Sequence, residues 1–300
     1  MIWLIGSSGL LGRTIAELLE KKYIPYIGGD KKVDISVSKE VSDFCVQNDS
    51  IKWIINCAAY TAVDLAENEQ ELAYKTNVVG IQNLIIAAKQ MNAVLINIST
   101  DYVYDGRQST PYKEIDIPFP CGVYGKTKYE GDKLIQNTLN RYYIFRTAWL
   151  YGLFGNNFVF KMLKLMNTKD KIQVVNDQFG SPTNAETLAK IIFKFYELYT
   201  MGSPPNYGLY NITDTGYTTW FGFAKEIYRQ GKAFGIITKD CQIEACTTSE
   251  YITKAKRPAY SVLDKNKIKN IAGIVLPEWK VSLNNFFRNF TNDEIRKLHE

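Results

Sequence analysis

The feature that most constrains the fold is a short apolar run at the start of the chain that leads directly into three glycines. Ile2-Trp3-Leu4-Ile5 is typical of a strand and is followed by Gly6-Ser7-Ser8-Gly9-Leu10-Leu11-Gly12. Backbone N–H groups with no Cβ in the way, at the positive end of a helix, favour a pyrophosphate. The spacing is GxxGxxG and not the usual GxGxxG, so the flanking strand and helix patterns carry the prediction. We expect a dinucleotide to contact Gly6, Ser8, Gly9, Leu10, Leu11 and Gly12.

The first half of the chain alternates β-rich runs with helical patterns, which indicates βαβ units and a parallel sheet. Strands are predicted at 2–5, 26–27, 53–56, 94–99 and 142–146. Apolar residues recur at helical spacing from Leu11 to Leu19 and from Leu84 to Met91. Right-handed crossovers would place helices on both faces of the sheet. The predicted fold is α/β, a Rossmann-type doubly wound parallel sheet with a smaller C-terminal substrate-binding domain.

The alternation loosens after Arg146 into segments rich in Gly, Asn, Pro and Tyr. We therefore expect an NAD(P)-binding domain over 1–150, completed by part of 170–205, and a mainly substrate-binding, interleaved region over 151–300. The softest linker is Gly202-Ser203-Pro204-Pro205-Asn206, and a second, smaller region is expected to begin near it.

Composition excludes several classes of function. The net charge of +5 comes from 36 basic and 31 acidic side chains with no run of five like charges, so no nucleic-acid partner is expected. No stretch reaches the roughly 18 apolar residues that span a bilayer, so no membrane partner is expected either. Five cysteines without paired spacing favour reduced thiols and a cytoplasmic protein. Because His299 is the only histidine, neither a histidine-rich metal site nor a Ser-His-Asp triad can form.

The identity of the dinucleotide depends on residues that follow the second predicted strand. Asp30 can accept hydrogen bonds from an adenosine ribose, as in NAD(H), whereas Lys31 and Lys32 can pair with the 2′-phosphate of NADP(H). Both cofactors stay open, with NADPH slightly favoured. Asp34 and Ile35 are expected beside the adenine, with a plain turn role for the acid as the alternative.

A Tyr-x-x-x-Lys spacing supplies the candidate for proton transfer. Hydride transfer to a carbonyl leaves an oxyanion that must be protonated, and without histidine the best local donor is a phenol with a lowered pKa. Tyr124 and Lys128 are four residues apart, so on a helix the ammonium can stabilise the phenolate. An exposed i,i+4 pair is the alternative. Thr100 ends a predicted strand, where such sheets bind ligands, and is expected to hydrogen-bond the substrate carbonyl.

Several further segments accompany these motifs along nearly the whole chain. They are Asn56-Cys57-Ala58-Ala59-Tyr60-Thr61-Ala62-Val63-Asp64, Ser99-Thr100-Asp101-Tyr102-Val103-Tyr104, Arg146-Thr147-Ala148-Trp149-Leu150-Tyr151, Gly155-Asn156-Asn157-Phe158, Asn176-Asp177-Gln178-Phe179-Gly180-Ser181-Pro182-Thr183 and Arg257-Pro258. On these residues the chain resembles the dTDP-4-dehydrorhamnose reductase family of the extended short-chain dehydrogenase/reductases. The resemblance implies reduction of the 4-keto group of a nucleotide-linked deoxysugar by NADPH or NADH, with dTDP-4-dehydro-L-rhamnose as substrate and dTDP-L-rhamnose as product.

The resemblance also implies roles for individual residues. Thr100 would polarise the C4 carbonyl, Tyr124 would donate the proton, and Lys128 would lower the tyrosine pKa and hold the nicotinamide ribose. Further cofactor contacts are expected from Cys57, Ala58, Ala59 and Tyr60. Substrate contacts are expected from Asp101, Trp149, Asn157, Gln178 and Arg257. By residue type alone, core packing for the tryptophan, turn capping for the two amides and a surface salt bridge for the arginine stay open.

One position departs from the family. In some members, carboxylates bind Mg²⁺ at a dimer interface, one of them in the helix after the glycine loop, and Thr14 stands at the matching position here. Glu186 alone is not enough, because magnesium needs several oxygen ligands. No metal is therefore expected, and a monomer and a homodimer both stay open.

Two other kinds of function fit the same scaffold. One is a different nucleotide-sugar 4-reductase, an epimerase or a dehydratase. Tyr102 follows Thr100-Asp101 in place of the Asp-Glu pattern of dehydratases, which favours a plain reductase. The other is a non-catalytic nucleotide-binding regulatory subunit, such as that of methionine adenosyltransferase, because a fold does not establish chemistry. Thr100, Tyr124 and Lys128 occurring together favour catalysis.

Overall fold

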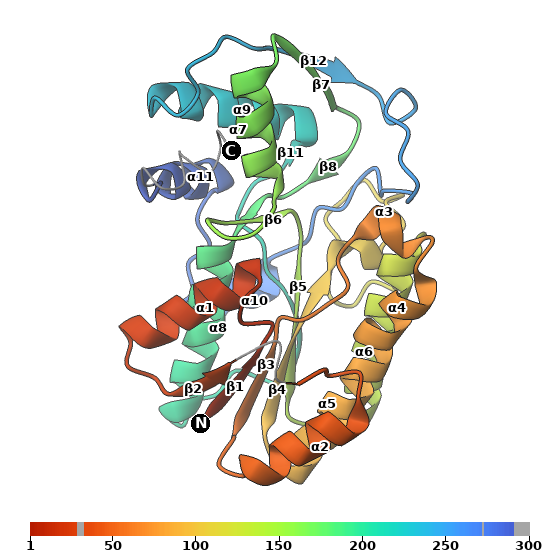
Figure 1. Ribbon diagram of the computed structural model, residues 1–300, viewed down its shortest axis with the longest axis vertical. Helices are drawn as coiled ribbons and strands as arrows, with labels where there is room; N and C mark the ends of the chain where they lie inside the picture. Colours follow the sequence, from red (N-terminus) through yellow and green to blue (C-terminus); the bar gives the residue numbers. More distant parts are fainter. Residues whose placement is uncertain (29–32, 272, 291–300) are drawn as a thin grey trace.

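The computed structural model describes residues 1–28, 33–271 and 273–290. Its lower part in Figure 1 is a six-stranded sheet with helices on both faces, and its upper part holds shorter strands and further helices. Asp30, Lys31, Lys32 and His299 lie outside the described residues.

All six strands of the central sheet run parallel, in the order β10-β5-β4-β3-β1-β2. They are β1 (Ile2–Ile5), β2 (Tyr26–Gly28), β3 (Trp53–Asn56), β4 (Val94–Thr100), β5 (Tyr142–Thr147) and β10 (Gly208–Asn211). The order reverses between β1 and β3, and ligands of such sheets bind in the crevice at the carboxyl ends of the strands there. The predicted doubly wound α/β fold is confirmed, as are the five strands expected in the first half.

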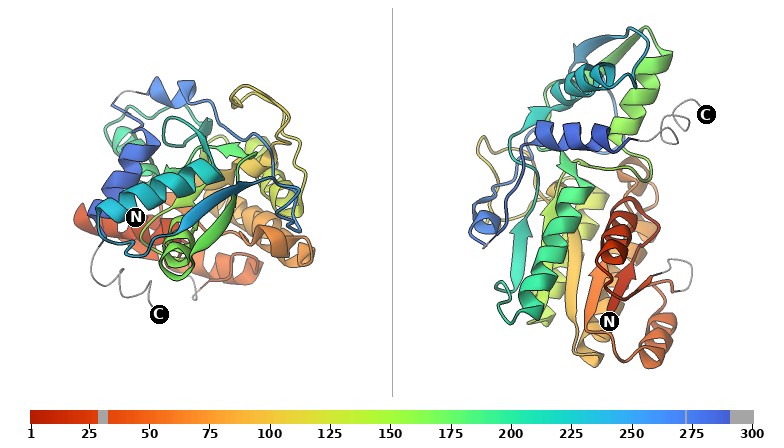
Figure 2. Two further views of the ribbon diagram at one scale, coloured as in Figure 1. Left: turned by 90° about the horizontal axis from the view of Figure 1, so that it is seen from above. Right: turned by 90° about the vertical axis from the view of Figure 1, so that its left-hand side faces the viewer.

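Helices cover both faces of the sheet, because each carries one apolar face that must be buried. On one face α1 (Leu10–Lys21) packs beside α8 (Ala185–Thr200) over a core that includes Leu4, Ile55 and Phe145. The other face is covered by α2 (Ser38–Gln47), α5 (Gly80–Gln90) and α6 (Val123–Thr138). The two layers are visible on either side of the strands in Figures 1 and 2.

Short helical segments lead from β3 to α5 and follow β4. α3 (Val63–Ala66) and α4 (Gln70–Tyr74) come first, and the π-helical segment η1 (Lys75–Val79) runs into α5. The 3-10 turn η2 (Asp101–Val103) follows β4 directly. These segments place several side chains beside the carboxyl edge of the sheet.

The upper part has its own apolar core, in which Tyr151, Phe223 and Phe286 are buried. Its strands form three pairs, β6 (Leu150–Tyr151) with β9 (Thr183–Asn184), β7 (Lys171–Val175) with β12 (Gln242–Cys246), and β8 (Phe179–Gly180) with β11 (Thr218–Thr219). Its helices are α7 (Phe158–Thr168), α9 (Trp220–Ala233) and α11 (Trp279–Arg288), while α10 (Asn266–Lys269) packs against β10 of the sheet.

The chain passes between the two parts more than once. After α7 and β7 in the upper part it returns through α8 and β10, and β10 pairs with β5. The segment 202–206 lies between α8 and β10. Both neighbouring elements belong to the sheet part, and the chain enters the upper part again after β10, at β11, so the start of a second region near this segment stays a prediction.

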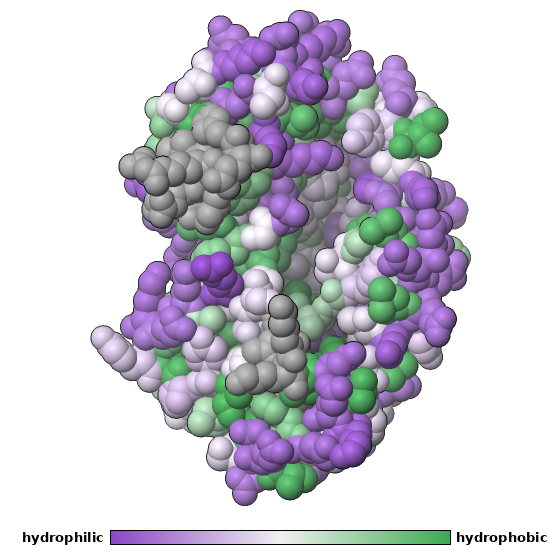
Figure 3. Space-filling model, in the orientation of Figure 1, coloured by the Kyte–Doolittle hydropathy of each residue, from purple (hydrophilic) through white to green (hydrophobic). Residues whose placement is uncertain are grey.

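The molecular surface in Figure 3 is hollowed between the two parts, beyond the carboxyl ends of the central strands. Within the described ranges, no helix is both long and apolar enough to cross a membrane. Loops that follow β1, β3 and β4 lie at the carboxyl edge of the sheet and carry eight of the residues singled out in the sequence, Gly6, Ser8, Gly9, Cys57, Ala58, Ala59, Tyr60 and Asp101.

Candidate active site

The glycine loop forms a close-packed turn between β1 and α1. Gly6 has φ +75°, and a Cβ there would lie 2.7 Å from the backbone nitrogen of Ala58. A Cβ on Gly12 would collide with the carbonyl oxygen of Gly6. Gly9 is the N-cap of α1 and has no side chain to bond the first amides of the helix. The loop therefore brings backbone N–H groups and a helix N-terminus to the switch point of the sheet, which fits a dinucleotide pyrophosphate.

The loop after β3 lies against the glycine loop and is held by two buried asparagines. The side-chain oxygen of Asn56 accepts from the nitrogen of Ala58 at 3.1 Å, and that of Asn77 accepts from the nitrogen of Tyr60 at 2.9 Å. Cys57, Ala58 and Ala59 are partly exposed. Small side chains at this point allow close approach to the backbone, and their contact with the cofactor stays a prediction.

The two residues expected beside the adenine are engaged within the protein. Asp34 accepts hydrogen bonds from the nitrogen and hydroxyl of Ser36, at 2.9 and 2.7 Å, and these lower the pKa of its carboxyl. Ile35 is 5% exposed and packs against Gly80 in the core beneath α5. The side chain of Ile35 thus fills the core and Asp34 has the hydrogen bonds of a turn acid, while contact of this segment with the adenine stays a prediction.

Thr100 and Tyr124 meet where β4 ends and α6 begins. The first turn of α6 is fixed by Glu67, whose carboxylate accepts from the nitrogen of Val123 at 2.9 Å, and by Gly125, where any Cβ would collide with the carbonyl oxygen of Tyr102. The Tyr124 ring packs edge-on against that of Tyr102, with centroids 5.6 Å apart. The Thr100 hydroxyl lies near enough to hydrogen-bond the phenol and lower its pKa. The structure thus brings together the residues that the sequence predicted to act on the carbonyl.

Burial dominates the protonation of this pair. It raises the pKa of Tyr124 well above the ordinary value, despite the opposing effect of Thr100. The expected lowered pKa is therefore not seen, because taking a phenolate out of water costs more than one hydroxyl recovers. Lys128 is 4% exposed, and burial lowers the pKa of its ammonium, while Asp132 and Cys57 raise it. At neutral pH the tyrosine holds its proton, as a general acid must.

Asp101 is a buried carboxyl next to Thr100. It is 2% exposed, and the hydroxyl of Thr100 donates to its Oδ1 at 3.1 Å. Burial raises the pKa of Asp101 to about 6. Contact between Asp101 and the sugar stays a prediction.

Trp149 is held in an unusual backbone conformation by packing on both sides. Its φ is +47°, and its indole stacks on that of Trp220 with centroids 3.5 Å apart and planes 9° apart. A Cβ on Gly180 would lie 2.5 Å from the same indole. One indole face is therefore covered by a second tryptophan that the sequence analysis missed, because nothing in the pattern before α9 pointed to a stacking partner.

The other three expected substrate residues make contacts within the protein. Asn157 caps α7, accepting from the nitrogens of Val159 and Phe160 at 3.1 and 3.3 Å. Gln178 is 5% exposed and donates to the hydroxyl of Thr248 at 3.0 Å. Arg257 forms an ion pair with Asp64, as the salt-bridge alternative held.

Thr14 and Glu186 are the two positions that were considered for a metal site, and both make contacts within the protein. The hydroxyl of Thr14 donates to the carbonyl oxygen of Leu10 at 2.8 Å, and Glu186 accepts from Asn289 and Lys190. Within the described ranges, no group of three or more acidic, histidine or cysteine side chains is arranged to hold a metal ion.

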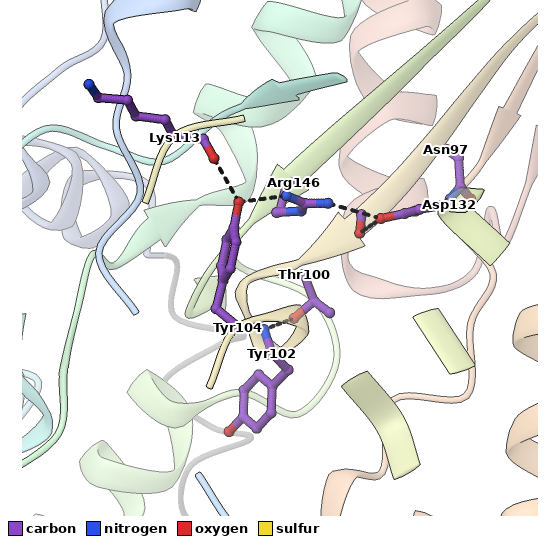
Figure 4. Close-up of polar contacts among 8 residues, drawn as sticks. Asn97, Thr100, Tyr102, Tyr104, Lys113, Asp132 and Arg146 are labelled. Carbon is purple, nitrogen blue, oxygen red and sulfur yellow. Dashed lines mark hydrogen bonds and ion pairs between the residues drawn. The ribbon is translucent and has the colours of Figure 1, made fainter. Parts of the chain in front are cut away.

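A buried polar chain behind Thr100 was also missed. It runs from Asn56 to Asn97 at 3.0 Å, from Asn97 to Asp132 at 3.3 Å, and from Asp132 to Arg146 at 3.5 Å. Figure 4 shows it continuing from Arg146 to Tyr104, whose hydroxyl accepts at 2.7 Å. Only the Asp132 position, four residues after Lys128, could have been singled out from the spacing.

Comparison with known proteins identifies the family. Residues 1–292 match the family described as RmlD substrate binding domain. The chain belongs to this family. It is 39% identical over 282 residues to the dTDP-4-dehydrorhamnose reductase of Aggregatibacter actinomycetemcomitans, covering 93% of this chain and 96% of that protein.

Solved structures of family members agree with the fold. The dTDP-4-dehydrorhamnose reductase of Clostridium acetobutylicum has a TM-score of 0.88 at 40% identity, covering 96% of this chain and 98% of that one. The reductase of Bacillus anthracis in complex with NADP has a TM-score of 0.89 at 34% identity, covering 96% and 99%.

Proposed function

We propose that the chain reduces the 4-keto group of a nucleotide-linked deoxysugar with NADPH or NADH, converting dTDP-4-dehydro-L-rhamnose to dTDP-L-rhamnose. The observation that carries this function is the meeting of Thr100 and Tyr124 at the carboxyl edge of the sheet, with Lys128 one turn further along α6. Relatives named dTDP-4-dehydrorhamnose reductase match nearly the whole chain, and we infer the substrate from their name.

The cofactor would be held by the two loops at the switch point. The backbone of Gly6 to Gly12 would bind the pyrophosphate, the loop Cys57 to Tyr60 would flank the nicotinamide half, and Lys128 would hold its ribose. A bound reduced nicotinamide supplies the hydride. NAD(H) and NADP(H) both remain open, since Asp30 and Lys31 lie outside the described residues and the Bacillus anthracis relative is in complex with NADP.

The chain's own residues would polarise the C4 oxygen of the sugar and protonate it. The Thr100 hydroxyl would donate to the sugar C4 oxygen, and the protonated Tyr124 would give its Oη proton to the same oxygen as negative charge develops there. The ammonium of Lys128 would then stabilise the phenolate that remains. The burial that raises the pKa of Tyr124 keeps the donor protonated until that moment.

The substrate would lie between the two parts of the molecule. Asp101 and Trp149 would contact the sugar, and Arg257 would meet the diphosphate through its planar guanidinium. For the domains, we propose that 1–150 with α8 and β10 binds the cofactor and that the rest of 151–300 binds the substrate. A cytoplasmic location without a nucleic-acid partner is part of the same proposal.

The test follows NADPH and NADH oxidation with enzymatically generated dTDP-4-dehydro-L-rhamnose, with UDP- and GDP-linked 4-keto sugars run beside it. We expect oxidation with the dTDP-linked sugar and formation of dTDP-L-rhamnose. Oxidation only with another nucleotide sugar would show that this sugar, and not the dTDP-linked one, is the substrate. No oxidation with any of them would overturn the reductase function and favour a nucleotide-binding subunit.

A further inference from the structure

Two positively charged side chains are buried in the described part of the chain: Arg146 contacts the carboxylate of Asp132, and Lys128 lies one helical turn before Asp132 on α6. Lys128 is 4% exposed and Arg146 is 2% exposed, while Asp132 is fully buried. The other buried carboxylates within the described ranges are Asp101 and Asp214. A buried cation without a counter-charge is strongly destabilised, so Lys128 and Arg146 both need a nearby negative charge, and Asp132 can supply it.

Asp132 is fixed by donors from two strands. Its Oδ2 accepts from the hydroxyl of Ser99 and from Nη2 of Arg146, the latter at 3.5 Å. Its Oδ1 accepts from the side-chain nitrogen of Asn97 at 3.3 Å. Figure 4 shows Asn97 and Arg146 approaching the carboxylate from neighbouring strands. Burial raises the pKa of Asp132, whereas Arg146, Lys128 and the Ser99 hydroxyl lower it, so these partners oppose the loss of its charge and hold the group in one orientation.

Lys128 depends on this carboxylate more than Arg146 does. The guanidinium of Arg146 also donates to the hydroxyl of Tyr104 at 2.7 Å and lies 5.1 Å from that ring. Lys128 is one helical turn before Asp132 on the buried face of α6. The groups that act on its charge are Asp132 from α6 and Cys57 from the loop after β3.

We propose that Asp132 is a positioning residue: its carboxylate keeps the buried ammonium of Lys128 charged beside Tyr124, a role that rests on the reductase function proposed above. Burial pushes the pKa of Lys128 down and Asp132 pushes it up, so removing the carboxylate lets the ammonium lose its proton at lower pH. Asp132 also raises the pKa of Tyr124. Both effects act on the alkaline side of the pH profile.

The test compares Asp132→Asn, which keeps the shape and removes the charge, with the wild-type enzyme. We expect the alkaline limb of kcat/KM to move to lower pH by about one unit or more, as for loss of a neighbouring opposite charge. A second readout is NADPH affinity, followed by fluorescence from pH 6 to 10. As pH rises, the loss of NADPH affinity should begin at a lower pH in the variant than in the wild type, because a neutral Lys128 holds the ribose less well.

The matched control is Asp214→Asn, which neutralises another fully buried carboxyl away from Lys128. Its alkaline limb should match that of the wild type, and Asp132→Glu should restore the limb. Where Asp132→Asn does not fold, the double variant Asp132→Asn/Arg146→Gln removes both charges and replaces it.

Superimposed limbs and superimposed NADPH profiles for Asp132→Asn and the wild type would overturn the proposal. An equal shift in Asp214→Asn would overturn it as well. An inactive wild-type protein would count against the reductase function instead, and the NADPH profiles alone would then decide the role of Asp132.

Discussion

Arg257 and Asp64 form a two-point ion pair across 193 residues of sequence, with Nη2 to Oδ2 at 2.7 Å and Nη1 to Oδ1 at 3.2 Å. Asp64 also accepts from the nitrogen of Ala255 at 3.1 Å. The pair ties the C-terminal segment to α3, which follows the cofactor-side loop. It also lowers the pKa of Asp64.

Breaking this pair should weaken substrate binding more than catalysis. In Asp64→Ala the segment around Arg257 loses its anchor, and we expect KM for the nucleotide sugar to rise about fivefold, equivalent to about 1 kcal/mol, with kcat within about twofold. Steady-state kinetics measure the split. Asp43→Ala, which breaks the exposed pair with Lys39, is the control and should change neither constant. A fall in kcat with KM unchanged would contradict the anchoring role.

Removing the Tyr124 hydroxyl should separate binding from turnover. Tyr124→Phe should bind NADPH nearly normally, because the ring still packs on Tyr102, while kcat falls by about 10²–10⁴ for loss of a general acid. Tyr129→Phe, on the same helix, should behave like the wild type. Unchanged turnover in Tyr124→Phe would show that another group donates the proton.

The glycine loop should tolerate no side chain at its third glycine. In Gly12→Ala the new methyl group would collide with the Gly6 carbonyl, so the backbone of the loop must shift. We expect NADPH affinity, measured by fluorescence, to fall at least about tenfold. Thr14→Ala, two residues later in α1, loses only a hydroxyl bonded to Leu10 and should keep the affinity. Equal affinities for both variants would remove the loop from the cofactor site.

The tryptophan stack should be needed for sugar binding. Trp220→Leu removes the flat partner of Trp149 and should cost about 0.5–1.5 kcal/mol of stability beyond lost burial, with a higher KM for the nucleotide sugar. Trp220→Phe keeps a flat ring and should retain most of the affinity. Identical KM values for both variants and the wild type would mean that the stack does not shape the pocket.

Asp214 should make stability depend on pH in a defined direction. It is fully buried, and burial raises its pKa from 3.8 to about 6, so the folded protein binds this proton more tightly than the unfolded chain. Its contribution is complete below pH 3.8 and is lost as pH rises through about 6. When the pH rises from 5 to 7.5, the free energy of unfolding should therefore fall by about 1–3 kcal/mol less in Asp214→Asn than in the wild type.

Denaturant unfolding at several pH values measures this difference. Asp170→Asn is the control, because the pKa of that exposed carboxyl is lowered by Lys239 and it titrates below this range. A wild-type slope equal to that of Asp214→Asn would contradict the assignment.

Local patterns predicted much of this molecule. The limits of β1 and β3 agree with the structure residue for residue, and the glycines of the first loop stand where backbone contact demands them. Tyr124 and Lys128 lie four residues apart on α6, a spacing of about one helical turn that can be read directly from the sequence. These features depend on neighbours in sequence, which a pattern records.

Features that depend on distant neighbours were not predictable. The pKa direction of Tyr124 follows from burial, and the ion pair of Arg257 depends on Asp64, which lies 193 residues earlier in the chain. Ile35 was expected beside the adenine, and its side chain packs in the core because α5 covers it. The Asp132–Arg146 contact joins a helix to a strand, and no periodicity in either one records the other.

The late arrival of β10 has a consequence for synthesis of the chain. Strand β5 is complete at Thr147, but its outer edge is paired only when residues Gly208–Asn211 have been made. Until the ribosome has added those 60 or so residues, roughly several seconds of elongation, β5 presents unpaired N–H and C=O groups to other chains. A fragment ending near residue 150 should therefore aggregate, and a nascent chain of this length is a natural substrate for chaperones.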